Sequence, residues 1–159
     1  MNGIKMRNIL SLGLASVLTL ATSAHAAAPN YWYLFSTKGF DVYKITDQQG
    51  LTLTITCAEG YGSSDNSVEL AKGSKSIGKE LTLVMDDVPF DIPTDTYTTN
   101  DDAVTWENFF TSLKDTKEIT VYTNNKKVAF FHLNAKNTSK IFSKAECRAK
   151  KNWEAYLNM

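Results

Sequence analysis

A strictly alternating segment is the sequence feature that most restricts the fold. In LTLTITC, residues 51–57, apolar side chains alternate with threonines, and the last apolar position is Cys57. Successive side chains of a strand point to opposite faces of a sheet, so this pattern predicts a strand with one buried face. We therefore expect an antiparallel sheet with Cys57 on its core-facing side, at the end of the strand.

The N-terminal residues have the layout of a secretory signal peptide. Lys5 and Arg7 precede an apolar run of 13 residues, 9–21, and AHA at residues 24–26 places small residues where a signal peptidase cuts. A membrane-spanning helix needs about 20 apolar residues, so this run is too short to be an anchor. We predict a signal peptide over residues 1–26, cleavage near Ala26, no membrane span, and a periplasmic or secreted product.

Export decides how the two cysteines are interpreted. Cys57 and Cys147 are the only cysteines, and they form no Cys-x-x-Cys redox motif. A nucleophilic cysteine would need a histidine base, for which His132 is the only candidate after the signal peptide. Because exported proteins enter oxidising compartments, we predict a structural disulfide between Cys57 and Cys147.

Length and charge narrow the class of protein. Residues 27–159 are enough for a single domain with its own core. Removal of Lys5 and Arg7 with the signal peptide leaves 15 basic and 17 acidic residues. A chain without a basic excess is not expected to bind nucleic acid.

Hydrophobic patterns predict a mainly β domain. We predict strands at 31–36, 40–45, 51–57, 67–71, 79–86, 88–93, 117–123 and 128–134. Two prolines make 88–93 an edge strand or an extended loop. Both faces of 128–134 are apolar, so we expect that strand in the centre of a sheet.

Two helices are predicted in the second half of the chain. Trp106, Phe109, Phe110 and Leu113 recur at helical spacing, which predicts a helix at 102–114 that is capped by the polar residues 100–102. A second short helix is predicted within 137–147, with Thr138 or Ser139 as its cap and a break near Glu146. The predicted fold is an antiparallel β-sandwich or small barrel with one or two short helices, the first of which covers one opening.

Motifs that would indicate catalysis or a metal centre are weak. His132 lies near a strand end, where we expect a partly buried, hydrogen-bonded residue, and no Gly-x-Ser-x-Gly elbow is present. One histidine and two oxidised cysteines do not make a zinc site, and no EF-hand spacing exists for calcium. We predict no metal and no cofactor. A weaker alternative is a glycan hydrolase that uses paired carboxylates from Asp86, Asp87, Asp91 or Glu107.

An acidic and aromatic surface is the candidate binding site. Residues 86–102 contain six aspartates and no basic residue, and tyrosines occur in the loop at 59–67 and in the acidic segment. Tyrosine on an exposed loop is a common interface anchor. The predicted binding residues are Tyr61, Asp65, Asp91, Asp95 and Tyr97. The alternative, that both tyrosines only cover a sheet edge, stays open.

The order of segments from residue 51 onward resembles small exported proteins of the invasion-associated locus B type. The matching pieces are LTLTITC at 51–57, SVELAKGSKSIGKELTLVMDD at 67–87, FFTSLKDTKEITVYT at 109–123 and VAFFHLNAKNTSKIFSKA at 128–145. The resemblance implies a β-rich exported fold. The chain lacks the additional cysteines typical of that family, so the resemblance implies no activity.

Together these features favour a periplasmic, non-enzymatic protein that binds another protein. We expect an inhibitor or immunity-type protein that neutralises a toxin or a lysozyme-like, cell-wall-lytic enzyme, because a rigid scaffold loses little entropy on binding. The alternatives are a small secreted or envelope virulence-associated protein and the glycan hydrolase. The sequence leaves the oligomeric state open.

Overall fold

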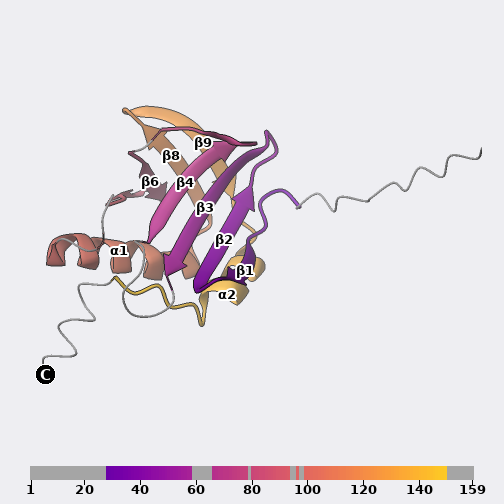
Figure 1. Ribbon diagram of the computed structural model, residues 1–159. Helices are drawn as coiled ribbons and strands as arrows, with labels where there is room; N and C mark the ends of the chain where they lie inside the picture. Colours follow the sequence, from indigo (N-terminus) through magenta and orange to yellow (C-terminus); the bar gives the residue numbers. More distant parts are fainter. Residues whose placement is uncertain (1–27, 59–65, 79, 94–95, 97–98, 150–159) are drawn as a thin grey trace, which may run out of the picture.

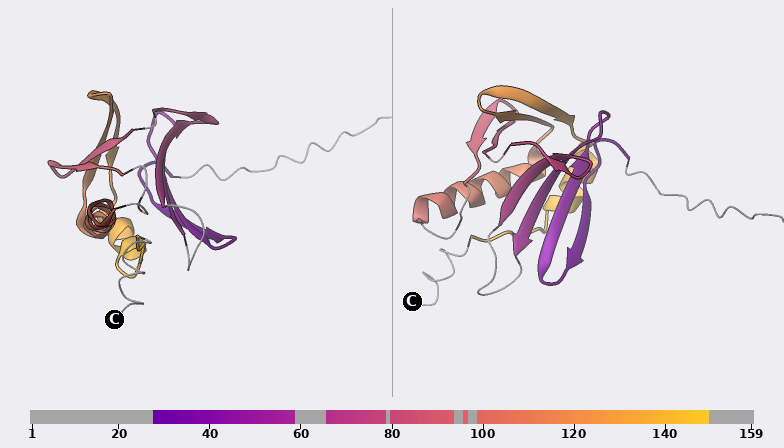
Figure 2. Two further views of the ribbon diagram at one scale, coloured as in Figure 1. Left: turned by 60° about the vertical axis from the view of Figure 1, so that its left-hand side comes forward. Right: turned by 45° about the horizontal axis from the view of Figure 1, so that its top comes forward.

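Two antiparallel sheets form the domain and face each other as two layers (Figures 1 and 2). The structure is a computed structural model that describes residues 28–58, 66–78, 80–93, 96 and 99–149, so the predicted signal peptide lies outside the described residues. Because the strands divide into separate sheets, the fold is a mainly β sandwich, one of the two architectures predicted from the sequence.

Sheet A contains five strands in the order β1-β2-β3-β4-β5: β1 (Tyr33–Thr37), β2 (Phe40–Thr46), β3 (Leu51–Ala58), β4 (Ser67–Lys72) and β5 (Lys75–Ser76). Sheet B contains four strands in the order β7-β6-β8-β9: β6 (Thr82–Met85), β7 (Val88–Asp91), β8 (Glu118–Thr123) and β9 (Lys126–His132). All pairs of neighbouring strands are antiparallel.

The helices lie together at one end of the sandwich (Figure 2). They are α1 (Asn100–Ser112), the short 3-10 helix η1 (Leu113–Asp115) and α2 (Ala135–Phe142). The apolar residues predicted to share one face of the first helix are buried, which confirms that face. The predicted starts differ from the structure: Thr99 caps α1 and Asn134 caps α2, and each side chain accepts a hydrogen bond from the backbone N–H three residues later. Thr138 and Ser139, the two predicted caps, lie instead within α2, where Thr138 is fully buried.

The core lies between the two sheets and extends onto the helices. The alternation predicted for β3 is present in full, since every second residue from Leu51 to Cys57 is buried. The inner face of sheet A contributes Tyr43, Ile45, Leu53, Ile55 and Leu70, and that of sheet B contributes Leu83, Met85, Ile119, Val121 and Phe131. Both sheets therefore bury one face against the other, as a sandwich requires.

A disulfide between Cys57 and Cys147 joins the end of β3 to the segment after α2, as the sequence predicted. The two Cα atoms are 5.4 Å apart, and both residues are buried. The chain does not continue as a helix to this point: α2 ends at Phe142, earlier than the break predicted near Glu146. The buried amide of Asn66 adds a second link, because it accepts from the N–H of Ala58 and donates to the carbonyl of Arg148, both at 3.0 Å.

The prediction that strand 128–134 is central was wrong. β9 is an edge strand of sheet B, and it covers Lys126–His132. Its second apolar face is exposed instead of buried, with Phe130 at 42% exposure. Within the described residues, no helix combines the length and the apolar character needed to cross a membrane.

Candidate binding surface

The predicted acidic-aromatic patch falls mostly outside the part of the chain that the structure describes. Its residues outside the described ranges are Tyr61, Asp65, Asp95 and Tyr97. The fifth, Asp91, is exposed at the end of β7, where its carboxylate accepts a hydrogen bond of 2.8 Å from the hydroxyl of Thr82 on β6. The patch as a whole therefore stays a prediction.

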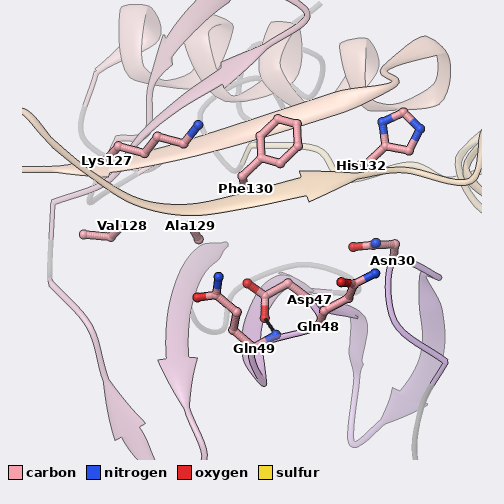
Figure 3. Close-up of a pocket in the computed structure, with 9 residues that line it drawn as sticks. All are labelled: Asn30, Asp47, Gln48, Gln49, Lys127, Val128, Ala129, Phe130 and His132. Carbon is pink, nitrogen blue, oxygen red and sulfur yellow. Dashed lines mark hydrogen bonds between the residues drawn. The ribbon is translucent and has the colours of Figure 1, made fainter.

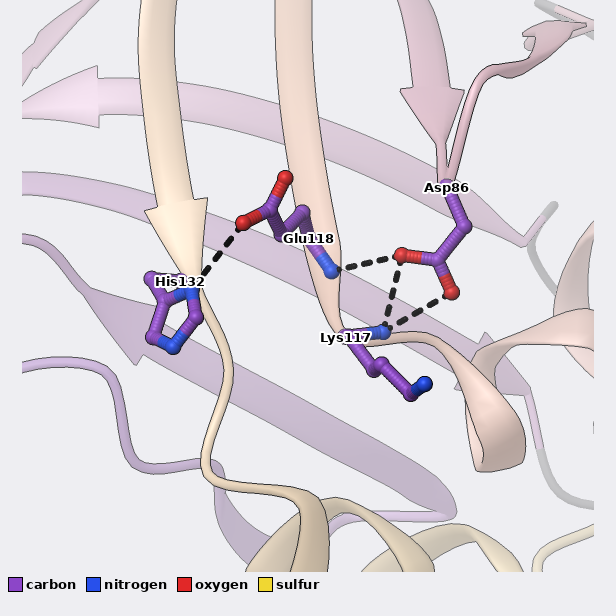
Figure 4. Close-up of polar contacts among 4 residues, drawn as sticks. All are labelled: Asp86, Lys117, Glu118 and His132. Carbon is purple, nitrogen blue, oxygen red and sulfur yellow. Dashed lines mark hydrogen bonds and ion pairs between the residues drawn. The ribbon is translucent and has the colours of Figure 1, made fainter.

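The carboxylate of Asp86 has a structural role. It accepts hydrogen bonds from the backbone N–H of Lys117, at 3.0 and 3.1 Å, and from that of Glu118, at 2.9 Å (Figure 4). These bonds fasten the turn between β6 and β7 to the start of β8. Because both of its oxygens accept backbone hydrogen bonds, Asp86 is poorly suited to be a general acid or base.

His132 is exposed, so the prediction that it is partly buried was wrong, although it is hydrogen-bonded as expected. Its Nδ1 lies 3.2 Å from Oε1 of Glu118 on the neighbouring strand (Figure 4). The two residues are directly opposite each other in the β8–β9 register. Within the described ranges, no three His, Cys, Asp or Glu side chains are grouped as a metal site would require.

A cavity of about 390 Å³ separates β9 from the turn between β2 and β3 (Figure 3). The carboxylate of Asp47 lies in its wall, but it accepts hydrogen bonds of 2.8 Å from the N–H groups of Gln49 and Leu51 and so holds the turn. The side chains of Phe130 and His132 project on the other side of β9, away from Asp47 (Figure 3). The polar groups of this cavity therefore do not converge on a common point.

The outer face of sheet A, the face turned away from sheet B, is a better candidate. Strand register places Tyr33, Lys44, Thr54 and Glu69 side by side in one row across β1 to β4. These residues line a hollow of about 510 Å³, together with Phe35. The hollow thus combines two aromatic rings, several hydroxyls, a cation and a carboxylate, groups that suit a polar partner with apolar contacts.

Exposed apolar side chains gather along β1, beside this hollow. Of the seven large apolar side chains that are exposed in the described part, four belong to residues 31–35. Tyr33 and Phe35 point to the outer face and are 40% and 44% exposed, while Leu34 is 43% exposed at the rim of the inner face. The Nζ of Lys44 lies 5.2 Å from the centre of the Phe35 ring. Such a concentration of apolar surface is typical of an interaction site.

Sequence reasoning missed this surface. The segment YWYLFS is predicted to be a strand, but its apolar residues do not alternate with polar ones. An unbroken apolar run normally indicates a buried strand, whereas β1 is exposed along its whole length. An apolar run carries no information on whether the strand that it forms lies at the edge of a sheet or in its centre.

Fold and surface define the chain as a small, disulfide-closed β-sandwich domain with an aromatic hollow on one sheet. The chain belongs to the YfjT family, whose family model matches residues 30–142. It is 28% identical over 154 residues to the uncharacterized protein YfjT of Escherichia coli (strain K12), a match that covers 91% of this chain and 98% of the relative. It is also 30% identical over 147 residues to the uncharacterized protein YkfB of the same strain, which covers 85% of this chain and 94% of the relative.

These relatives bring no activity to the chain, because both are described as uncharacterized. No solved structure matches the chain. The comparisons do not support the resemblance to the invasion-associated locus B type. That resemblance implied a β-rich fold, and the structure has one.

Proposed function

We propose that this YfjT-family protein is an extracytoplasmic, non-enzymatic protein that binds another protein through the outer face of sheet A. In its specific form, the proposal is that the protein is an inhibitor or immunity-type protein, which neutralises a toxin or a lysozyme-like enzyme by covering part of its surface. The location is the periplasm, or the exterior after secretion, reached through the signal peptide predicted for residues 1–26.

The observation that carries the proposal is the exposure of Tyr33 and Phe35 at the rim of the hollow. Aromatic side chains lose little conformational entropy when they are buried, and they are enriched among the residues that dominate binding energies. Lys44 and Glu69 lie on either side of Thr54, so both signs of charge are available to orient a partner.

The scaffold supports this use. The Cys57–Cys147 disulfide closes a loop with a sequence separation of 90 and is compatible with an oxidising, extracytoplasmic compartment. A cross-linked sheet presents its side chains with little rearrangement, which reduces the entropic cost of binding. The carboxylates of Asp86 and Asp91 accept hydrogen bonds within sheet B, which favours binding over the carboxylate-based hydrolase.

Substitution at the floor of the hollow tests the proposal. Thr54→Arg places a long cation between Lys44 and Glu69, where it fills the space that a partner would occupy. The purified protein is used to capture its partner from a periplasmic extract. The captured protein is identified by mass spectrometry, purified, and titrated with each variant by calorimetry. We expect Thr54→Arg to weaken binding at least about tenfold, the effect of losing one important interface contact.

The matched control is Thr120→Arg, at a half-buried threonine on the central strand β8 of sheet B. It should leave the affinity within about twofold, because surface changes away from an interface have small effects. Equal loss in both variants, or loss in neither, would exclude the outer face of sheet A. An equimolar amount of the protein should abolish the activity of the captured enzyme; a complex with full enzyme activity would refute the inhibitory role.

A further inference from the structure

The four sheet edges formed by the described strands differ in how they are protected against pairing with another strand. Natural edge strands are usually blunted by proline, by charge or by short length. In sheet B, β7 contains Pro89 and Asp91, and β9 begins with two lysines. In sheet A, β5 has only two residues, one of them Lys75. β1, with the sequence YLFST, has neither proline nor charge, and it is the one unguarded edge among the described strands.

The turn after β1 shows which of its backbone groups are free. Lys38 and Gly39 have φ of 50° and 82°, as in a two-residue type I′ turn, which closes on a hydrogen-bonded pair of residues, here Thr37 and Phe40. Hydrogen-bonded pairs alternate along an antiparallel ladder, so the N–H and C=O groups of Leu34 and Ser36 point away from β2.

Trp32 is the preceding residue whose backbone N–H and C=O groups point away from β2, and both of these groups already have a hydrogen-bond partner. The side-chain amide of Asn137, on α2, accepts from the N–H of Trp32 at 2.7 Å and donates to its carbonyl at 3.2 Å. This contact imitates a neighbouring strand at that point. Of the described residues, none covers Leu34 and Ser36 in the same way, so the free edge is limited to the length of β1 itself.

We propose that this edge binds β1 of a second copy of the chain, antiparallel and across a two-fold axis at Phe35. Leu34 of each copy then pairs with Ser36 of the other, and the two Phe35 residues lie opposite each other. Directly opposed residues in such a pair have Cβ atoms about 5 Å apart, close enough for the rings to be in contact. The two five-stranded sheets become one continuous sheet.

Several features favour a second copy as the occupant. An uncharged strand meets no like-charge repulsion from its own copy, and each exposed apolar residue gains an apolar or hydroxyl-bearing neighbour. The Lys44 residues are at least three strand spacings apart, about 14 Å, which exceeds the screening length of about 8 Å at physiological salt. The type I′ turn curves toward β2 directly after Thr37, so the turn of the partner copy leaves room for Asn137 beside Trp32.

Dimerisation would also enlarge the surface proposed above for protein binding, although the inference does not depend on that function. A two-fold axis perpendicular to the sheet keeps both outer faces on the same side. The hollows of the two copies then lie on one face, with Tyr33 and Phe35 of both copies at its centre. The contact involves only one short strand from each copy, so we expect a weak dimer.

Amide hydrogen exchange of the unmodified protein is the direct test. Sedimentation velocity between about 1 µM and 1 mM, the range of a weak contact, first establishes the dimer. Exchange at Leu34 and Ser36 should then slow at least about tenfold from low to high concentration, since pairing protects amides from solvent. The amides of Tyr33 and Phe35, which face β2, serve as internal controls and should change little. Protection of Leu34 and Ser36 that does not depend on concentration would overturn the proposal.

A pair of variants separates the edge from general surface effects. Leu34→Lys introduces the missing charge on β1, whereas Phe130→Lys makes a matched change on β9; the wild-type side chains are 43% and 42% exposed. Leu34→Lys should be monomeric at the highest concentration, and Phe130→Lys should dimerise like the wild type. Circular dichroism checks that both variants are folded. If Leu34→Lys still dimerises, or if Phe130→Lys also abolishes the dimer, the proposed contact is wrong.

Discussion

The indole Nε1 of Trp106 donates a hydrogen bond of 3.1 Å to the main-chain carbonyl oxygen of Cys147. Trp106 is fully buried on α1, and the sulfur of Cys147 is bonded to Cys57 at the end of β3. One residue of the C-terminal segment therefore links a helix through its backbone and a strand through its side chain. These two bonds fix the end of β3 relative to α1, and the segment that makes both of them is neither a helix nor a strand.

The Trp106 hydrogen bond can be measured against a second buried tryptophan. Trp106→Phe removes the donor and leaves the buried carbonyl of Cys147 unsatisfied, whereas the buried Nε1 of Trp32 has no hydrogen-bond partner among the described residues. Both substitutions remove a similar volume from the core. We expect Trp106→Phe to lower the free energy of unfolding by about 1–3 kcal/mol more than Trp32→Phe in urea denaturation. Equal losses would show that the hydrogen bond contributes nothing.

We expect the disulfide to contribute more to the free energy of unfolding than any other single bond in the domain. Replacing Cys57 and Cys147 together by alanine releases the constraint on a loop with a sequence separation of 90. The loop-entropy relation gives about 4–5 kcal/mol for that length, as an upper figure. Denaturation of the oxidised wild type, the reduced wild type and the double variant should give one high and two similar low midpoints. A reduced protein as stable as the oxidised one would contradict this expectation.

Asp86 and its neighbour offer a matched pair of substitutions. Both Asp86 and Asp87 have positive φ, 46° and 70°, so an alanine at either position is strained. Only Asp86 accepts hydrogen bonds from the backbone of Lys117 and Glu118. Asp86→Ala should therefore destabilise the domain by about 1–3 kcal/mol more than Asp87→Ala, as measured by thermal denaturation. If Asp87→Ala proves the more harmful, the carboxylate does not stabilise the start of β8.

Two glycines separate backbone strain from side-chain crowding. Gly50 and Gly78 have nearly the same φ, 78° and 76°, but only a Cβ at Gly78 would overlap Oγ1 of Thr123 and approach its Cβ to 3.0 Å. Gly50→Ala therefore carries the cost of positive φ alone, about 1 kcal/mol. Gly78→Ala should cost about 1–3 kcal/mol beyond that. Combining Gly78→Ala with Thr123→Ala, which removes Oγ1 and the methyl group, should recover part of this additional cost; no recovery would show that crowding against the Thr123 side chain is not its source.

The sequence predicted the buried face of a strand better than it predicted the order of the strands in a sheet. Alternation in β3 predicted which side of the strand is buried and that Cys57 lies on that side. Alternation carries no information about which strand lies alongside. The sequence therefore predicts a central strand at 128–134, although β9 is an edge strand, and it does not predict the exposure of β1.

The hollow on the outer face of sheet A could not be predicted from the sequence for the same reason. Tyr33, Lys44, Thr54 and Glu69 come from four different strands, and only their register places them in one row. No local pattern in the sequence encodes that register. The patch predicted from sequence relied instead on loops, and of its members only Asp91 lies in the described part of the chain.

Photo-crosslinking from the floor of the hollow tests the central claim most directly. A photoreactive amino acid replaces Thr54 on sheet A, or Thr120 on sheet B as the control, in the full-length chain within the cells that produce it. Thr54 should give a reproducible covalent adduct with one other protein, identified by mass spectrometry, and Thr120 should not. An empty result at Thr54, or the same adduct from both positions, would contradict the assignment of the outer face of sheet A as a binding surface.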